Sequence, residues 1–482
     1  MNAALQFAKQ KNIKSFLVLL FLTKPTIDLF WNYTVEFAGF NVGPLHITGI
    51  FVFFYLSYLL IVIPNNNAPC FKLLIIFVAL NFISAVFGFT MHDEFEIQGI
   101  LNLFFRVMDS VVIYGAAFAL ALRNEEKDWT QIVTSIAIGV GIALILNHIA
   151  IAAGYGGGMK VGAASMHSSL RERGLYYDPG ALAIVALYGF IFISYTIKNI
   201  KLGLFKLSFC VISLLSSVYL MVSGLSRSVF ILLAFYIVSF FVVFGKTKEK
   251  AFYILAIAAV IVVAATYSLV NYERLTARFD GDIGAVENIT EDVSTGKGVS
   301  TKDLAALGSN RGRNWIISLE WIFQRGPIEL MFGNFKSTPA HSDYIDILSR
   351  NGILGLTLYI FILFSFLTTT FKALSTSNKD EYYYLHVLSF VLIAIYILYS
   401  IPFRPLNYTT TAWYMWTALG FSMAQVRLAR RKRRLKVRQS MTQFNDVSSN
   451  TIQSGSTEPN SARKNGGPHA KPPTSPRPFS PR

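Results

Sequence analysis

Twelve apolar stretches dominate this sequence and restrict the folds open to it. Each is about twenty residues long, the length that a helix needs to cross the hydrocarbon core of a bilayer. The stretches cover residues 14–31, 44–63, 71–90, 98–122, 130–153, 179–197, 203–223, 228–244, 251–271, 351–371, 382–401 and 410–426. Only 15% of the 482 residues are charged and 53% are hydrophobic, which is typical of a polytopic membrane protein. The sequence therefore predicts an all-α integral membrane bundle of about twelve transmembrane helices.

The positions of the lysines orient this bundle in the membrane. If the N-terminus is cytoplasmic, most flanking lysines, including Lys14, Lys127 and Lys198, lie in or next to the cytoplasm. This agrees with the tendency of cytoplasmic loops to be rich in cations. The same threading makes residues 272–350 a large outer loop before the last three spans. The first apolar stretch is followed by no small-residue cleavage site, so we expect it to remain as the first span.

The net charge of +16 is concentrated in the C-terminal tail. Residues 426–482 contain thirteen Lys and Arg and two Asp and Glu, and eight of the cations lie within 426–438. A basic cluster directly after a span normally fixes topology and contacts anionic lipid, so we expect membrane lipids and no nucleic acid as partners. The remaining tail is rich in Ser, Pro, Gly and Asn and has too few apolar residues to fold. We therefore predict a membrane domain of residues 1–426 and a disordered cytoplasmic tail of residues 427–482.

Several arginines fall on the outer side, where topology disfavours cations. Arg171 and Arg173 precede the span 179–197, Arg227 lies in a tight outer turn, and Arg311 and Arg313 lie in the long loop. A guanidinium presents a planar fork of donors that binds phosphate, and it cannot lose its charge. Each arginine alone is as well explained by a lipid headgroup or a salt bridge. Together they predict a cationic outer vestibule for an anionic ligand.

His341 is the strongest single candidate for a catalytic residue. It lies at the outer face just before the span 351–371, where a neutral imidazole could accept a proton from an attacking hydroxyl. A lone surface histidine is uninformative by default, but the outer arginines weaken that interpretation. Asp178 could cap the following helix or neutralise Arg173. No ATP-binding or metal-ligand pattern stands out, so we expect no metal and no other cofactor.

The long outer loop changes character along its length. Its first part, through about Leu307, is aperiodic, whereas residues 313–325 are apolar with two tryptophans. That segment is too short to span the membrane and predicts a helix lying at the interface, with Arg311 and Arg313 before it or at its start. Residues 326–352 are a plausible second helical segment. A loop of this length with such content is usually functional.

Four motifs of this chain resemble those of the O-antigen ligase and O-antigen polymerase superfamily of bacterial membrane glycosyltransferases. They are RERGLYYDPGALA (171–183), SGLSRSVF (223–230), SNRGRNW (309–315) and MFGNFKSTPAHSDYIDILSRNGILGL (331–356). The resemblance implies an all-helical inner-membrane protein with a large periplasmic loop. It also implies metal-independent, inverting transfer of a glycan from a polyprenyl diphosphate donor, with the active site facing the periplasm.

The resemblance implies roles for individual residues as well. His341 would be the catalytic base for the acceptor hydroxyl. The residues implied to bind the donor diphosphate are Arg171, Arg227 and Arg311, and the supporting residues are Arg173, Asp178, Arg313 and Asp343. The common His-Asn and Pro-Asn pairs of the family are His341-Ser342 and Pro179-Gly180 in this chain.

Three functions stay open at this point. A polymerase would add the glycan to another lipid-linked repeat unit, and a ligase would add it to lipid A–core or to a protein. We favour the polymerase because the His-Ser-Asp-Tyr sequence looks closer to polymerase-type members. A transporter or flippase of lipid-linked sugars should show internal repeats and interrupted helices at mid-bilayer depth, and no convincing repeat is visible. Other polysaccharide assembly proteins are possible partners.

Overall fold

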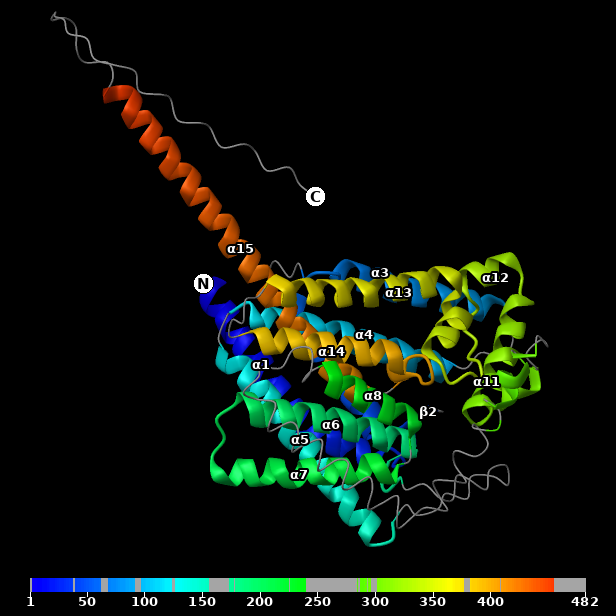
Figure 1. Cartoon of the computed structure of the whole chain (residues 1–482). Helices are drawn as coiled ribbons and strands as arrows, with labels where there is room; N and C mark the ends of the chain where they lie inside the picture. Colours follow the sequence, from blue (N-terminus) through cyan, green and yellow to red (C-terminus); the bar gives the residue numbers. More distant parts are fainter. Residues whose placement is uncertain are drawn as a thin grey trace, which may run out of the picture. The chain divides into compact units, whose positions relative to one another are not determined.

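The structure is a computed structural model that describes most of the chain. The described residues are 2–37, 40–61, 68–91, 97–123, 126–155, 173–176, 178–224, 226–239, 284, 287–292, 294–295, 301–376, 382–407 and 409–454. Within these ranges the chain is almost entirely α-helical, apart from an antiparallel hairpin of β1 (Val35–Phe37) and β2 (Phe40–Val42), in which Val35 pairs with Val42. The helices are α1 (Asn2–Ile27), α2 (Pro44–Ile61), α3 (Phe71–Met91), α4 (Ile97–Ala121), α5 (Glu126–Ala152), α6 (Pro179–Asn199), α7 (Leu204–Ser223), α8 (Arg227–Ile237), α11 (Thr301–Phe323), α12 (Pro327–Phe332), α13 (Asp343–Thr376), α14 (Tyr383–Tyr399) and α15 (Thr409–Ser454) (Figure 1).

Seven of the described helices contain a segment that is long and apolar enough to cross a membrane. These segments are Pro44–Ile61, Phe71–Thr90, Phe104–Ala121, Asp128–Ala152, Pro179–Asn199, Leu204–Ser223 and Asp343–Thr376. Large apolar side chains cover their outer surfaces: Phe51, Phe54 and Tyr58 of α2 are 58%, 61% and 62% exposed. Contiguous apolar exposure of this kind is unfavourable in water and normal against lipid. The protein thus has the features of a multi-pass membrane protein.

Eleven of the twelve predicted spans coincide in position with described helices, but only seven of these helices are long and apolar enough to cross a membrane. α1, α8, α14 and α15 coincide with four further predicted spans but are shorter or less apolar than the seven segments above. The predicted span 251–271 lies outside the described residues. A nearly all-helical fold is therefore confirmed, and the total of twelve spans and the periplasmic loop stay predictions.

Helix α6 forms the centre of the bundle. Every residue from Gly180 to Thr196 is buried, and α5, α7 and α8 all pack against the helix. Small residues allow this close approach: a Cβ atom placed on Gly189 would lie 2.6 Å from a side-chain atom of Leu144 in α5. Helix α6 is therefore packed closely by its neighbours along its length.

Helix α11 begins earlier than the sequence pattern indicates. We expected an interfacial helix over 313–325, whereas α11 runs from Thr301 to Phe323 and includes both Arg311 and Arg313. The reason is that residues 303–307, with the sequence DLAAL, are mostly strong helix formers, although they lack amphipathic periodicity. The second helical segment expected over 326–352 is only partly helical: α12 ends before Gly333 (φ 77°), residues 333–342 have no regular structure, and Asp343 begins α13.

Helix α15 is longer than expected. We expected disorder from residue 427, but α15 continues as a helix to Ser454. Its basic segment consists largely of Arg, Lys and Leu, which favour helix even where no core is available. The contacts divide the chain into two units, Met1–Leu428 and Ala429–Arg482, and the side chains described between Arg430 and Met441 in the second unit are exposed.

Several helix ends meet at one end of the Met1–Leu428 unit. A Cβ atom on Gly224, directly after α7, would lie 3.0 Å from the carbonyl oxygen of Pro179 at the start of α6. The backbone N–H of Asp343, at the start of α13, donates to the carbonyl oxygen of Ser400 at the end of α14 (3.1 Å). We call this end, which carries Asp178, Gly224 and Ser400, the site end. Helices α11 and α12 pack against α13 and lie at its N-terminal part (Figure 1).

Candidate functional site

A segment without regular structure, Gly333–Ser342, carries His341 and packs against the first part of helix α13. Two glycines with positive φ make this close packing possible: Gly333 (φ 77°) and Gly352 (φ 66°). A Cβ atom on Gly333 would lie 2.1 Å from the carbonyl oxygen of Arg350, and one on Gly352 would lie 2.3 Å from that of Met331. Two backbones therefore touch where any other residue would clash. Gly352 also breaks α13, so that the predicted span 351–371 corresponds to the part after this kink.

Asp343 fastens the end of this segment to the connection between α14 and α15. Its backbone N–H donates to the carbonyl oxygens of Ser400 (3.1 Å) and Phe403 (2.9 Å). Its carboxylate accepts a hydrogen bond from the N–H of Leu406 (3.1 Å) and longer ones from the hydroxyls of Tyr359 and Ser400 (both 3.4 Å). Asp343 is 2% exposed, so it supports the site as a buried structural bracket two residues after His341.

His341 lies at the surface of the site end, with charged groups from three other parts of the chain around it. Burial by the neighbouring protein is the largest influence on its imidazole and lowers its pKa. Arg404 and Arg311 lower this pKa further because two nearby cations disfavour a third, whereas Asp178 raises it. The neutral imidazole, which can accept a proton, is therefore favoured at neutral pH.

Arg311 approaches this group from helix α11. Its guanidinium carbon lies 4.3 Å from the centroid of the Phe403 ring, a cation–π contact that favours this position of the side chain. The same ring packs against the start of α6, where a Cβ atom on Gly180 would lie 3.0 Å from Phe403 Cε1. Phe403 thus links α11 to α6 at the site end.

Asp178 caps helix α6, as one of its two predicted roles requires. Its Oδ1 accepts hydrogen bonds from the N–H groups of Gly180 (2.6 Å) and Ala181 (3.0 Å), with Pro179 at the first helical position. The carboxylate is therefore held at the positive end of the central helix, close enough to His341 to affect its pKa.

The other predicted site residues are placed less closely together. Arg227 is the first residue of α8 and follows Gly224, which adjoins the start of α6. Arg173 opens a turn at the site end whose Leu175 N–H donates to Asn147 Oδ1 (2.7 Å). Arg171 lies outside the described residues.

Arg313 is exposed and belongs to a different face of its helix from Arg311. The two residues are two positions apart in α11, which corresponds to a rotation of about 200° around a helix with 3.6 residues per turn. They therefore cannot both face His341. The pKa of His341 responds to Arg311, and Arg311 is the member of the pair that the structure brings to the site.

Sequence analysis missed two residues of this site, Phe403 and Arg404. Both lie in the sequence IPFRPLN (401–407) between α14 and α15. The Nε atom of Arg404 donates to the carbonyl oxygen of Ala340 (2.7 Å), directly before His341. Arg404 could have been predicted, because the predicted topology places it as a further outer cation in a short connection, like Arg227.

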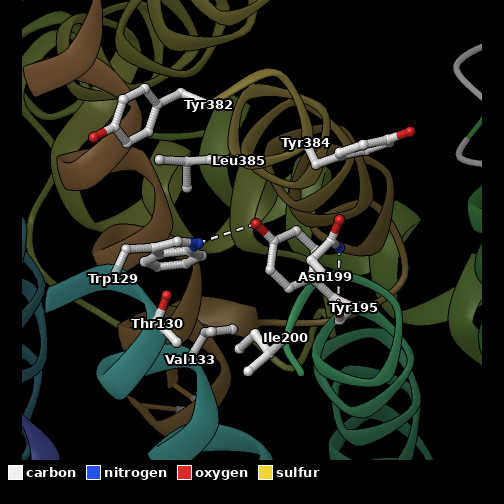
Figure 2. Close-up of a pocket in the computed structure, with 9 residues that line it drawn as sticks. All are labelled: Trp129, Thr130, Val133, Tyr195, Asn199, Ile200, Tyr382, Tyr384 and Leu385. Atoms are coloured by element: carbon white, nitrogen blue, oxygen red, sulfur yellow. Dashed lines mark hydrogen bonds between the residues drawn. The ribbon is translucent and has the colours of Figure 1, made fainter. Parts of the chain in front are cut away.

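A separate hollow lies at the opposite end of α6. It has a volume of about 100 Å³ and is lined by Trp129, Thr130, Val133, Tyr195, Asn199, Ile200, Tyr382, Tyr384 and Leu385. Figure 2 shows Trp129 donating a hydrogen bond from Nε1 to the hydroxyl of Tyr195 (3.0 Å). The length of α6 separates this hollow from Asp178 by roughly 30 Å at 1.5 Å per residue. None of the predicted site residues lines it, so we place the candidate site at the site end.

The described residues can thus supply a proton acceptor beside two cations at the surface of a membrane protein. Such an arrangement suits a reaction in which a hydroxyl loses a proton while negative charge develops on a nearby leaving group. No protein-family model and no curated protein sequence matches the chain.

Proposed function

We propose that this protein is a membrane glycosyltransferase that moves a glycan from a polyprenyl diphosphate donor to a sugar hydroxyl. The observation that carries this proposal is the convergence of His341, Arg311 and Asp178 from three distant parts of the sequence. A neutral histidine beside arginines at a helix-bundle end fits a hydroxyl acceptor and a diphosphate leaving group. The motifs that resemble the O-antigen ligase and polymerase superfamily support the same reaction.

The cations bind and stabilise the donor in this proposal. Arg311, with Arg227 and Arg171, binds the diphosphate, whose negative charge grows as its bond to the sugar breaks. The Phe403 ring holds the Arg311 guanidinium in place (4.3 Å), so little further ordering is needed when the donor binds. The polyprenyl chain enters sideways from the bilayer.

The histidine acts on the acceptor. The imidazole of His341 takes the proton of the acceptor hydroxyl while the hydroxyl oxygen forms a bond to the anomeric carbon. The bond between that carbon and the diphosphate breaks, and its electron pair leaves with the polyprenyl diphosphate. Attack opposite to the leaving group inverts the anomeric configuration. The proton is then passed from His341 to water.

The proposal extends to topology and location. Twelve spans with both termini in the cytoplasm place the site end on the periplasmic face of the bacterial inner membrane. There it meets donors, acceptor glycans, membrane lipids and other polysaccharide assembly proteins. Reporter fusions after Lys250 and after Asn310 should report opposite sides of the membrane, and the same side for both would overturn this topology.

The fate of the donor in cells tests the function. His341→Ala should stop glycan transfer, so lipid-linked donor accumulates on the outer face of the membrane. Lys336→Ala, an exposed residue of the same segment, is the matched control and should transfer normally. Donor trapped on the cytoplasmic side in the His341 variant would indicate a transporter and contradict the proposal.

The same cells distinguish polymerase from ligase. Loss of a polymerase leaves single repeat units attached to the final acceptor. Loss of a ligase leaves long chains on the carrier lipid. We propose the polymerase, on the likeness of the His341–Tyr344 sequence to polymerase-type members, and long carrier-bound chains would show the ligase instead.

A further inference from the structure

Arg404 makes an unusually large number of contacts with the segment that carries His341. Its Nε donates to the carbonyl oxygen of Ala340 (2.7 Å), and its Nη2 contacts the carbonyl oxygens of Ala340 and Thr338. Its Nη1 lies 3.3 Å from the hydroxyl of Ser337 and 3.4 Å from the carboxylate of Asp346. All three guanidinium nitrogens are therefore engaged with protein atoms.

This geometry differs from that of a ligand-binding arginine. A planar fork of donors that is directed at two backbone carbonyls fixes the path of the backbone between them. The carbonyl of Ala340 belongs to the peptide bond that joins it to His341, so the position of this bond sets where the imidazole can lie. Arg404 reaches across from the α14–α15 connection, more than sixty positions later in the sequence.

We infer that Arg404 is a positioning residue, which clamps Ser337–Ala340 to the α14–α15 connection and thereby holds the His341 imidazole in its working place. The inference rests on the proposed function only in treating His341 as the catalytic base. The clamp itself follows from the contacts of Arg404.

The charge of Arg404 adds a second effect to the clamp. The charged groups around His341 come from three elements: Arg404 from the α14–α15 connection, Arg311 from α11, and Asp178 before α6. Arg404 is the cation with the larger effect, and it lowers the pKa of the imidazole. A clamp that carries a positive charge thus also keeps the proposed base neutral.

Arg350, which shares the Asp346 carboxylate with Arg404, offers a matched control for this inference. Asp346 pairs with Arg404 (3.4 Å) through one carboxylate oxygen and with Arg350 (2.9 Å) through the other. Arg350 stands one turn further along α13, and it is not among the groups that shift the pKa of His341. Losing Arg350 therefore removes an ion pair to the same carboxylate and leaves the clamp on Ala340 in place.

The experiment uses the full chain in membranes, with Arg404→Gln, Arg404→Lys and Arg350→Gln. The rate of modification of His341 by diethyl pyrocarbonate is followed against pH by mass spectrometry of its peptide. This reagent reacts with the neutral imidazole, so the midpoint reports the pKa of His341 whether or not the protein is an enzyme. Glycan transfer is measured over the same pH range.

For Arg404→Gln, we expect the midpoint of His341 modification to move to higher pH, because the cation is removed. In Arg404→Lys the charge stays and the fork is lost. We therefore expect a midpoint near that of the unaltered protein, while the acceptor-dependent rate of glycan transfer falls. Arg350→Gln should match the unaltered protein in both readouts.

Two results would overturn the inference. One is an unchanged midpoint in Arg404→Gln, and the other is full transfer in Arg404→Lys with a normal pH profile. Failure of the proposed function would look different: no variant, nor the unaltered protein, would transfer glycan, yet the midpoint would still shift in Arg404→Gln. If Arg404→Gln fails to insert, the Arg404→Lys variant still decides the clamp.

Discussion

Removal of the Asp343 carboxylate should loosen the segment that carries His341 by an amount that can be worked out from its contacts. The bond from the N–H of Leu406 is well formed (3.1 Å), whereas those from Tyr359 and Ser400 are long (both 3.4 Å) and contribute little. In Asp343→Ala the buried N–H of Leu406 loses its partner, which costs roughly 1–3 kcal/mol. Since about 1.4 kcal/mol is a factor of ten, local opening should increase by roughly 5-fold to 150-fold.

Asp343→Asn is the matched variant for this prediction. All three donors bond to the same carboxylate oxygen, Oδ2, so the amide oxygen of asparagine in that position can still accept from the N–H of Leu406 and from the two hydroxyls. We expect most of the loss to be restored. Hydrogen exchange of the amides between Ser337 and Asp346, measured in lipid nanodiscs, gives the opening free energy directly. Exchange in Asp343→Ala that equals that of the unaltered protein would refute the role of Asp343 as a bracket.

Three further predictions concern activity. Arg311→Ala should lower glycan transfer severely, and Arg311→Lys should restore it only in part, because lysine supplies the charge without the fork of donors. Arg313→Ala, on the other face of α11, should leave the transfer rate unchanged. Equal rates for the two alanine variants would contradict the assignment of Arg311. Burial, Arg404 and Arg311 lower the pKa of His341 below 6.5, the ordinary histidine value. The rate of transfer should therefore persist below pH 6.5 and fall only as the pH drops through the lowered pKa. A rate that already falls above pH 6.5 on acidification would contradict a lowered pKa. Truncation after Ser440 should retain transfer in a well-inserted protein, and lost activity would show a role for the tail.

The membrane-spanning helices were predictable because apolar length is a local property. The stretches 179–197 and 203–223 differ by at most two residues at each end from α6 (Pro179–Asn199) and α7 (Leu204–Ser223). The helical start of α11 at Thr301 was missed because its residues favour helix without an apolar period. The extension of α15 to Ser454 was missed for a similar reason: basic residues suggested a solvated tail, although Arg and Lys favour helix.

The site was predictable in its residue types and less so in its geometry. The capping role of Asp178 follows from its position directly before a predicted span, whereas His341 and Arg311 were chosen for their residue types and their place in the loop 272–350. The contact between the backbones at Gly333 and Gly352 depends on tertiary packing and has no signature beyond two glycines. Arg404 was accessible to the same charge argument as Arg311, but its clamp on Ala340 joins segments distant in sequence and could not be derived from either alone.

A reconstituted reaction tests the central claim most directly. The purified full chain in nanodiscs is given a polyprenyl diphosphate-linked oligosaccharide, and release of free polyprenyl diphosphate is measured together with growth of the glycan. We predict that both occur in equal amounts, and that His341→Ala lowers the rate by a factor of roughly 10² to 10⁴, as removal of a general base does. An unchanged donor with the unaltered protein, or an equal rate with His341→Ala, would contradict the account.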